Sequence, residues 1–366
     1  MKYYIIAGEA SGDLHGSNLA SEIFSNDTEA QIQGWGGYRM ANNGVEIKKH
    51  IKDLAFMGFI EVVMNLKTIM RNIKQCKSEI ESFQPDALIL IDYPGFNMRI
   101  AAWAREKGLR VYYYISPQIW AWKRNRVKKI RRDVRKIFVI LPFEKDFYKK
   151  YGVEAEFVGH PLLDAIENFK SDTDTEDFGN GKPILALLPG SRKQELKKML
   201  PLMVEASKKY AEEFTIVIGG LSNVKELYTD YLNDHISIVY DKSYRLLNQA
   251  KAAFVTSGTA TLETALFSVP EVVCYKASPI SYHIAKRLIK VKYISLVNLI
   301  ADAPVVKELI QHELNIKNMH KEMDLLLNDS PELKKMKDNY GMIHEKLGGI
   351  GASKRVATKI IEDLTN

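Results

Sequence analysis

Apolar residues along this chain fall into two patterns: short continuous runs, and longer segments in which they recur every three or four positions. Continuous runs are typical of parallel strands buried on both faces, and the longer periodicity is typical of amphipathic helices. The strands predicted in the first half cover residues 2–7, 30–36, 86–92, 110–115, 136–140 and 154–158. Those predicted in the second half cover residues 184–188, 215–219, 236–239, 252–255 and 272–275. The helical segments between them predict an α/β fold with doubly wound parallel sheets.

The alternation of strands and helices stops once and then begins again, which predicts two Rossmann-like domains facing a cleft. We assign residues 1–170 to the first domain and 182–347 to the second, with the polar, glycine-containing segment 171–181 as a linker. Asp172-Thr173-Asp174 in this linker is formally a D-x-D pattern, but no strand precedes it, so we predict no metal site. A glycine-rich turn at 348–351 precedes a final helix at 352–364.

Residues 54–70 read as a helix in which 12 of 17 residues are apolar, with bulky side chains at Phe56, Met57 and Phe59. One interpretation is a buried core helix, and the other is a helix that enters a membrane interface or an acyl-chain pocket. Sequence alone leaves both open. A basic amphipathic helix is predicted at 282–291, and the chain from residue 305 onward reads as helical.

With 366 residues, 46% of them apolar and 27% charged, the chain has the composition of a globular protein with room for two cores. No uncharged apolar stretch approaches the roughly 20 residues that a membrane span needs. The N-terminal apolar run is too short for a secretory signal, and Cys76 and Cys274 have no metal-ligand spacing. These features favour a protein of the reducing cytoplasm without a cofactor.

The formal net charge of +7 comes from one segment. Residues 123–136 hold nine Lys and Arg and one acid, a local balance of +8 that leaves the rest of the chain at about −1 (7 − 8). Trp120 and Trp122 stand immediately before it, so aromatic and cationic side chains are combined. Such a face suits phosphate head groups or an anionic bilayer, whereas a solvated charged helix and a single-stranded nucleic acid are the alternatives.

Acidic residues follow two predicted strands of the first half, at the edge where ligands bind in open α/β sheets. Glu9 and Asp13 follow the first strand, in a glycine-containing loop that matches neither a dinucleotide-binding fingerprint nor a P-loop. Asp92 ends the strand at 86–92 and precedes a helix, a position suited to a general base. Ser11 or Asp13 could equally cap the helix, and Asp92 could cap its turn.

Two turns of the second half have the features of anion-binding helix starts. Pro189-Gly190-Ser191-Arg192 ends a buried strand, and Gly190 allows a close backbone approach. Ser191 can cap the next helix, and Arg192 can bind phosphate oxygens through two N–H groups. Ser257-Gly258-Thr259-Ala260-Thr261 opens another helix, whose N–H groups and dipole favour anions, and Glu263 could accept from ribose hydroxyls. Each turn alone could be structural, but together they predict a metal-free cradle for a nucleotide diphosphate.

Four segments stand out as a set: Glu9-Ala10-Ser11-Gly12-Asp13, Ser116-Pro117-Gln118-Ile119-Trp120-Ala121-Trp122, Leu188-Pro189-Gly190-Ser191-Arg192 and Ser257-Gly258-Thr259-Ala260-Thr261-Leu262-Glu263. Together they are similar to motifs of the lipid-A-disaccharide synthase family. The likeness runs from the first strand to the last helix, with the motifs in family order. It implies a GT-B fold in which the last segment, 348–366, crosses back onto the first domain.

The resemblance also implies a metal-independent, inverting glycosyltransferase of lipid A biosynthesis. It would transfer 2,3-diacylglucosamine from UDP-2,3-diacylglucosamine to O6 of 2,3-diacylglucosamine 1-phosphate and release UDP. Because both substrates carry acyl chains, we expect peripheral association with the anionic cytoplasmic face of the inner membrane, and no nucleic-acid partner. A homodimer stays open.

The resemblance carries over to individual residues. Some family members carry an acid at the position of Gly95, so the base here must be another group, with Asp92 first and Glu9 and Asp13 next. The expected UDP-sugar residues are Gly190, Ser191, Arg192, Ser257, Gly258, Thr259, Ala260, Thr261 and Glu263. The expected acceptor or membrane residues are Trp120, Trp122, Lys123, Arg124, Lys128, Lys129, Arg131, Arg132, Phe56, Met57 and Phe59.

Two other functions remain as rivals. A UDP-N-acetylglucosamine 2-epimerase-like enzyme leaves the 54–70 and 112–136 segments unexplained. A non-catalytic membrane-binding or RNA-binding protein leaves the paired anion-binding turns unexplained.

Overall fold

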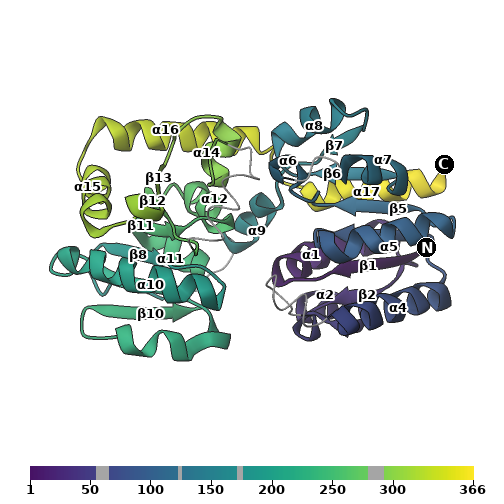
Figure 1. The fold of residues 1–366 in the computed structure, drawn as a ribbon, viewed down its shortest axis with the longest axis horizontal. Coiled ribbons are helices and arrows are strands. Elements are labelled where there is room, and N and C mark those ends of the chain that lie inside the picture. The colour runs from purple at the N-terminus through teal and green to yellow at the C-terminus, as the bar shows by residue number, and fades with distance from the viewer. Residues whose placement is uncertain (55–65, 123–125, 171–175, 279–291) are drawn as a thin grey trace. The chain divides into compact units, whose positions relative to one another are not determined.

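The structure is a computed structural model that describes residues 1–54, 66–122, 126–170, 176–278 and 292–366 (Figure 1). Its contacts divide the chain into two compact units. Unit 1 consists of Met1–Asp164 and Leu347–Asn366, and unit 2 consists of Ala165–Lys346. The chain therefore returns to unit 1 at its C-terminal end, and each unit has its own parallel sheet.

In unit 1, the described residues form a parallel sheet with the strand order β3-β2-β1-β4-β5-β6-β7. The strands are β1 (Lys2–Ala7), β2 (Gln31–Gly36), β3 (Glu46–His50), β4 (Ala87–Ile91), β5 (Val111–Tyr114), β6 (Lys136–Val139) and β7 (Ala155–Phe157). β1 lies between β2 and β4, where Ile5 aligns with Gly34 on one side and Ile89 on the other. The strand order reverses at this central strand, which is the Rossmann-like doubly wound arrangement that the sequence predicts.

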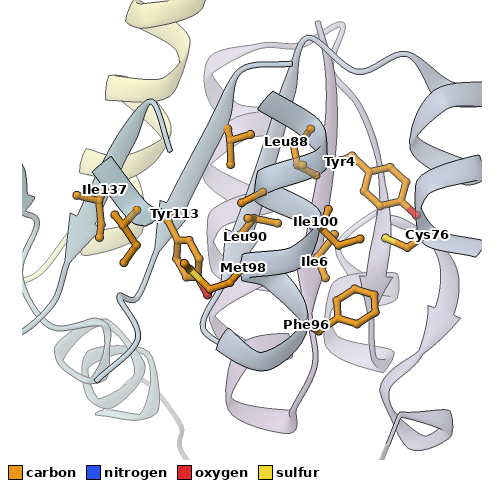
Figure 2. Packing of buried hydrophobic residues seen from close by; sticks show 14 of the residues in the cluster. Tyr4, Ile6, Cys76, Leu88, Leu90, Phe96, Met98, Ile100, Tyr113 and Ile137 are labelled. Carbon is orange, nitrogen blue, oxygen red and sulfur yellow. The ribbon is translucent and has the colours of Figure 1, made fainter. Parts of the chain in front are cut away.

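Alternate residues of the central strands supply two cores, as expected for a sheet that is covered on both faces. Tyr4, Ile6 and Leu90 pack with α4 (Leu66–Phe83) and α5 (Pro94–Glu106), and Figure 2 shows this cluster. Tyr3 and Ile5 pack with α1 (Ala10–Asn26) and α17 (Ala352–Thr365). The other described helices that begin in this unit are α2 (Tyr38–Asn42), η1 (Ile51–Asp53), α6 (Ile119–Trp122), α7 (Val127–Asp133), α8 (Pro142–Lys149) and α9 (Pro161–Lys170).

The C-terminal helix α17 belongs to unit 1, which confirms the predicted return of the last segment (Figure 1). Val356, Ala357 and Ile360 are fully buried in the core that α1 also lines. The chain is tightly packed in the turn just before α17. A Cβ at Gly348 would lie 2.9 Å from the ring of Phe157. Burial of an apolar stripe, rather than helix propensity alone, fixes α17 in this place.

In unit 2, the described residues form a parallel sheet with the order β10-β9-β8-β11-β12-β13. The strands are β8 (Ile184–Leu188), β9 (Thr215–Gly220), β10 (Ile236–Tyr240), β11 (Ala250–Thr256), β12 (Glu271–Tyr275) and β13 (Lys307–Ile310). The described helices are α10 (Lys193–Ser207), η3 (Lys208–Tyr210), η4 (Ser222–Leu227), η5 (Thr229–Tyr231), α11 (Ser243–Gln249), α12 (Thr259–Leu266), α14 (Leu296–Ala301), η6 (Gln311–Glu313), α15 (Ile316–Leu327) and α16 (Pro331–Lys346). Residues 176–181 are tied to this unit, since Gln249 bonds to the backbone of Glu176 and Phe178.

Four segments differ from the pattern-based prediction or lie outside the described residues. The prediction of helix from residue 305 onward is wrong at 307–310, which forms the edge strand β13. The edge strand β3 is not predicted either, because an edge strand needs no continuous apolar run. Of the helix predicted at 54–70, residues 55–65 lie outside the described chain, and the described helix α4 continues to Phe83. The helix predicted at 282–291 also lies outside it.

Candidate active site

The candidate catalytic acids follow β1 and β4, which lie side by side in the unit 1 sheet. Ala7 aligns with Ile91, so the loops that begin at Gly8 and Asp92 are neighbours. The loops touch, since a Cβ at Gly8 would lie 2.3 Å from the ring of Tyr93. Only glycine allows this approach, and it brings the start of α1 next to the start of α5.

Asp92 has the features of a general base. It lies in the left-handed backbone region with a φ of 43°, followed by Tyr93 at 48°, which is uncommon for non-glycine residues. Tyr113 Oη and Asn97 Nδ2 donate to the Asp92 carbonyl at 2.6 and 2.8 Å and hold this conformation. Burial, and then the charge of Glu9, raise the pKa of the Asp92 carboxyl to about 7. A carboxyl that titrates near neutral pH is suited to accept a proton in catalysis.

The two other predicted acids differ in their surroundings. Glu9 is the N-cap residue of α1, and its side chain is half-buried. Asp13 is buried, and its carboxylate accepts hydrogen bonds from the backbone N–H groups of Gly37, Arg39 and Met40 at 2.6, 3.1 and 3.2 Å. Asp13 therefore holds the start of α2, a structural task, whereas the charge of Glu9 reaches the neighbouring β4 loop.

Trp120, which follows β5, does not lie on an exposed aromatic face. Trp120 is only 7% exposed, and its ring packs edge-on against Phe143 with centroids 5.0 Å apart. The prediction that Trp120 lies on a membrane-docking surface is therefore wrong, because the indole is part of the protein interior. The side chain of Trp122, and the residues Lys123 and Arg124, lie outside what the structure describes.

The predicted basic surface lies on α7. Four exposed cations form what we call the α7 basic face: Lys128, Lys129, Arg131 and Arg132. Val127 and Ile130 are buried on the other side of the helix, and Arg132 Nε lies 2.6 Å from Oδ1 of the buried Asp133. Phe56, Met57 and Phe59 lie outside the described residues. Along the ranges that the structure describes, no helix is long and apolar enough to cross a bilayer.

In unit 2, the two predicted anion-binding turns lie next to each other, because β8 and β11 are neighbouring strands. Leu188 aligns with Val255, and a Cβ at Gly190 would lie 3.5 Å from Cγ2 of Thr256. Gly190 has a φ of 104°, and its Cβ would also lie 2.9 Å from Oε2 of Glu195. A larger residue at Gly190 would therefore be strained and would fill the space between the turns.

Arg192 stands at the N-terminus of α10. It is the N-cap residue and is exposed, with Nη1 3.4 Å from Oε1 of Glu195. The prediction that Ser191 caps this helix is wrong, because the helix begins at Lys193, with Arg192 at the cap position. Tyr275, the last residue of β12, is close to the same pair: burial and Glu195 raise the pKa of its hydroxyl, and Arg192 lowers it. Sequence reasoning missed Tyr275, although a polar ring at the end of a predicted strand was a usable signal.

The start of α12 is open to solvent at Gly258 and Thr259. Ser257 and Thr261 use their hydroxyls inside the unit, donating to the carbonyls of Ile294 at 3.0 Å and Gly258 at 2.8 Å. The groups left for an anion are therefore the backbone N–H groups of the first turn and the exposed Thr259.

Glu263 and Thr256 lie behind this helix start. Tyr244 donates to Glu263 at 3.2 Å, and burial raises the pKa of the Glu263 carboxyl. The Thr256 hydroxyl is buried and has no hydrogen-bond partner among the described residues. Ala260 is half-buried, and its carbonyl accepts from Thr264 at 2.7 Å.

The two units thus present different chemistry at the carboxyl ends of their strands. Unit 1 presents a pair of interacting acids, one of which can accept a proton near neutral pH. Unit 2 presents two helix starts and a guanidinium, which can stabilise the negative charge of a diphosphate. In the described ranges, no group of three or more His, Cys, Asp or Glu could hold a metal ion.

Two parallel-sheet α/β units of this kind define the GT-B class of fold, and solved structures are similar along the whole chain. A UDP co-structure of MnaA from S. aureus has a TM-score of 0.70 at 12% identity and covers 100% of this chain and 97% of that one. The calicheamicin glycosyltransferase CalG4 has a TM-score of 0.62 at 15% identity, with 100% and 98% covered. UDP-GlcNAc 2-epimerase from Neisseria meningitidis, bound to UDP-GlcNAc, has a TM-score of 0.68 at 15% identity and covers 99% of this chain and 100% of that one. At these identities the likeness shows the fold alone.

The family is shown by closer relatives. A family model described as lipid-A-disaccharide synthetase matches residues 3–360. The lipid-A-disaccharide synthase of Geobacter sulfurreducens is 38% identical over 370 residues, covering 98% of this chain and 96% of the relative. The lipid-A-disaccharide synthase of Coxiella burnetii is 36% identical over 374 residues, covering 98% of this chain and 97% of the relative. The chain belongs to the lipid-A-disaccharide synthase family and is a glycosyltransferase of lipid A biosynthesis, which confirms the family predicted from the four motifs.

Proposed function

We propose that this protein transfers 2,3-diacylglucosamine from UDP-2,3-diacylglucosamine to O6 of 2,3-diacylglucosamine 1-phosphate. The products are a β-1,6-linked lipid A disaccharide 1-phosphate and UDP. We assign acceptor binding to residues 1–170, donor binding to 182–347, the linker to 171–181, and the returning helix to 348–366. Family membership along residues 3–360 and the different chemistry of the two sheet edges support this assignment.

One observation carries the proposed mechanism: Asp92 directly follows β4 at the carboxyl edge of the unit 1 sheet, where burial, and then the charge of Glu9, raise the pKa of its carboxyl to about 7. Its carboxylate takes the proton of the acceptor O6–H group while O6 forms a bond to C1 of the donor sugar. The bond from C1 to the diphosphate oxygen breaks, its electron pair leaves with UDP, and the configuration at C1 inverts. Arg192 and the N–H groups at the starts of α10 and α12 stabilise the leaving diphosphate, each preorganised donor contributing about 2–4 kcal/mol.

We further propose that the enzyme works bound to the anionic cytoplasmic face of the inner membrane, where its acylated substrates reside. The α7 basic face provides exposed cations for anionic head groups. The apolar segment 54–70, with Phe56, Met57 and Phe59, is the second proposed contact with the lipid phase.

Product analysis tests the reaction. The purified protein is incubated with the two acylated sugars in detergent micelles, and the disaccharide phosphate and UDP are quantified. Equal amounts of both products are expected. Formation of a 2-epimer from UDP-N-acetylglucosamine without any acceptor would instead favour the epimerase. Vesicle or RNA binding with no product would favour a non-catalytic protein.

A matched pair of variants tests the base. Asp92→Asn should lose most of the activity, whereas Asp86→Asn should keep it. Asp86 is exposed just before the other end of β4, where its carboxylate accepts from the Lys2 N–H at 2.7 Å. Equal activity of the two variants would contradict the assignment of Asp92.

A further inference from the structure

The backbone after β5 is held in an unusual shape. Ile115 has a φ of 62°, and a β-branched residue in the left-handed region is a conformational outlier that only its surroundings can hold. Ser116 and Pro117 are then buried, and Gln118 is exposed. Strain of this kind is concentrated where a protein must present a residue in one position.

This segment starts beside Asp92. The backbone N–H of Asp92 donates to the Tyr114 carbonyl at 3.2 Å, and the Tyr113 hydroxyl donates to the Asp92 carbonyl at 2.6 Å. The ends of β4 and β5 are therefore tied together, which places the beginning of the 115–118 segment next to the proposed base.

Helix α8 supplies the first support for the segment. The Ser116 hydroxyl lies 2.7 Å from the hydroxyl of Tyr148 and 3.1 Å from the Pro117 carbonyl. Because the Ser116 proton can point to only one acceptor, the arrangement in which both bonds form has Ser116 donating to Pro117 and Tyr148 donating to Ser116. Tyr148 is fully buried, so this bond is shielded from water.

Glu144 supplies the second support, one helical turn before Tyr148. It is 1% exposed, and its Oε2 accepts from the backbone N–H groups of Leu141 at 3.0 Å and Ile140 at 3.2 Å. Burial raises the pKa of the Glu144 carboxyl to about 7, while the Leu141 and Ile140 N–H groups, and then the side chains of Ser116 and Trp120, act to lower this pKa. The Trp120 indole N–H is buried with no hydrogen-bond partner among the described residues, and its ring packs edge-on against Phe143, the residue before Glu144.

We propose that Glu144 and Tyr148 are positioning residues that hold residues 116–120 so that Gln118 binds the acceptor sugar beside Asp92. Neither side chain touches the reacting atoms. Residues four apart on a helix lie on one face, so α8 can hold both ends of the segment at once. This inference rests on the proposed function, because it assigns the acceptor to this edge of unit 1.

The test separates an effect on acceptor binding from effects on donor binding, on turnover and on folding. Glu144→Gln keeps an oxygen for the Leu141 and Ile140 N–H groups but replaces the other carboxyl oxygen with an amide nitrogen, which cannot accept a hydrogen bond. Tyr148→Phe removes only the hydroxyl that bonds to Ser116. The matched control is Asp146→Asn, because Asp146 is an exposed acid on the same helix. For each variant, acceptor KM, donor KM, kcat and Tm are measured, together with direct equilibrium binding of 2,3-diacylglucosamine 1-phosphate.

In both test variants we expect acceptor KM and acceptor Kd to rise about tenfold, with donor KM within twofold and Tm within a few degrees of wild type. Gln118→Ala should give the same selective effect, and adding Tyr148→Phe to it should cost little more, because both act through one contact. Asp146→Asn should match wild type.

Unchanged acceptor binding in folded Glu144→Gln and Tyr148→Phe would overturn the inference, and so would an equal rise in donor and acceptor KM. If Glu144→Gln does not fold, Tyr148→Phe decides alone. If Tyr148→Phe does not fold, Ser116→Ala decides in its place, since it removes the bond between Ser116 and Tyr148 from the other side. Absence of product from the wild-type enzyme would count against the proposed function, while acceptor Kd would still judge the positioning residues.

Discussion

Asp92 and Tyr93 share a left-handed backbone, and asparagine is among the residues that tolerate this conformation best. Asp92→Asn should therefore remove the charge without adding strain. We expect kcat to fall by about 10²–10⁴, the usual range for a general base. Because the base must be deprotonated, the wild-type activity should rise as pH increases through about 7, and this limb should be absent from the residual activity of the variant. A rate–pH profile of both proteins measures this, and an unchanged limb in the variant would assign it to another group.

The same residue has a stability effect of predictable sign. Burial raises the folded-state pKa of Asp92 above its usual 3.8, so the folded protein keeps a proton that the unfolded chain loses between pH 4 and 7. Its stabilising contribution is complete below about pH 4 and is lost as pH rises through about 7. Asp92→Asn should thus be more stable than wild type at pH 8, by roughly 1–4 kcal/mol, and equal to it at pH 4. Urea unfolding at the two pH values measures the difference, and lower stability at pH 8 would contradict it.

The place of a residue in the fold was predictable where the local sequence pattern determines it. The place of Asp92 follows from the end of a continuous apolar run, and the structure has it directly after β4. The task of Asp13 was not predictable, because its three N–H partners come from residues 24 to 27 positions further along. Trp120 looked exposed beside a basic segment, but its burial depends on Phe143 in another helix.

At each proposed anion-binding helix start of unit 2, several backbone N–H groups point in one direction and act together on a bound anion. Arg192→Ala removes the charged member of this set, and we expect kcat/KM to fall by about 10²–10³ because one preorganised donor to the leaving group is lost. Lys193→Ala is the matched control, as Lys193 is an exposed neighbour paired with Glu226 at 3.3 Å. Steady-state kinetics and calorimetric UDP binding of both variants measure this. Wild-type turnover in Arg192→Ala would exclude its proposed role.

The α7 basic face acts as one surface rather than as single residues. Replacing Lys128, Lys129, Arg131 and Arg132 with Gln should weaken binding to vesicles of phosphatidylcholine with one third phosphatidylglycerol. At about 1 kcal/mol per cation near the membrane, the loss should reach two to three orders of magnitude. The control replaces four exposed lysines of unit 2, Lys321, Lys334, Lys335 and Lys337, so both variants have a formal net charge of +3 (7 − 4). Equal loss from both variants in vesicle sedimentation would mean that net charge, not this face, drives binding.

At the level of elements, the buried strands were the predictable part. β1 and β8 have the predicted bounds, because a strand covered on both faces must be continuously apolar. The edge strands β3 and β13 were missed, since half-exposed strands carry polar residues such as Lys48 and Glu308. Their existence depends on a neighbouring strand to pair with, which no local pattern contains.

At the scale of the whole molecule, the chain builds unit 1 from two segments that are separated by all of unit 2. The returning helix α17 fills a core face with Val356 and Ile360 and is anchored at its far end by Asp363. Contacts of this sequence separation are slow to form, because the loop between them must close first. The family resemblance, rather than any pattern in residues 352–364, predicted this return.

Asp363 tests how much the anchor contributes. Its carboxylate bonds to Arg135 and accepts from the Tyr112 hydroxyl at 2.6 Å, and Arg135 is the main cause that lowers the pKa of this acid. A lowered folded-state pKa stabilises the protein above about pH 4, and this contribution is lost as pH falls further. Asp363→Asn should keep an acceptor for Tyr112 but lose the charge, which costs about 1 kcal/mol and lowers the Tm of unit 1 by about 2–4 °C. The difference should be constant between pH 6 and 8 and shrink below about pH 4. Calorimetry of the full chain measures it, with the exposed neighbour in Glu362→Gln as control, and an equal shift in both variants would mean that the helix end, not the Asp363 anchor, is responsible.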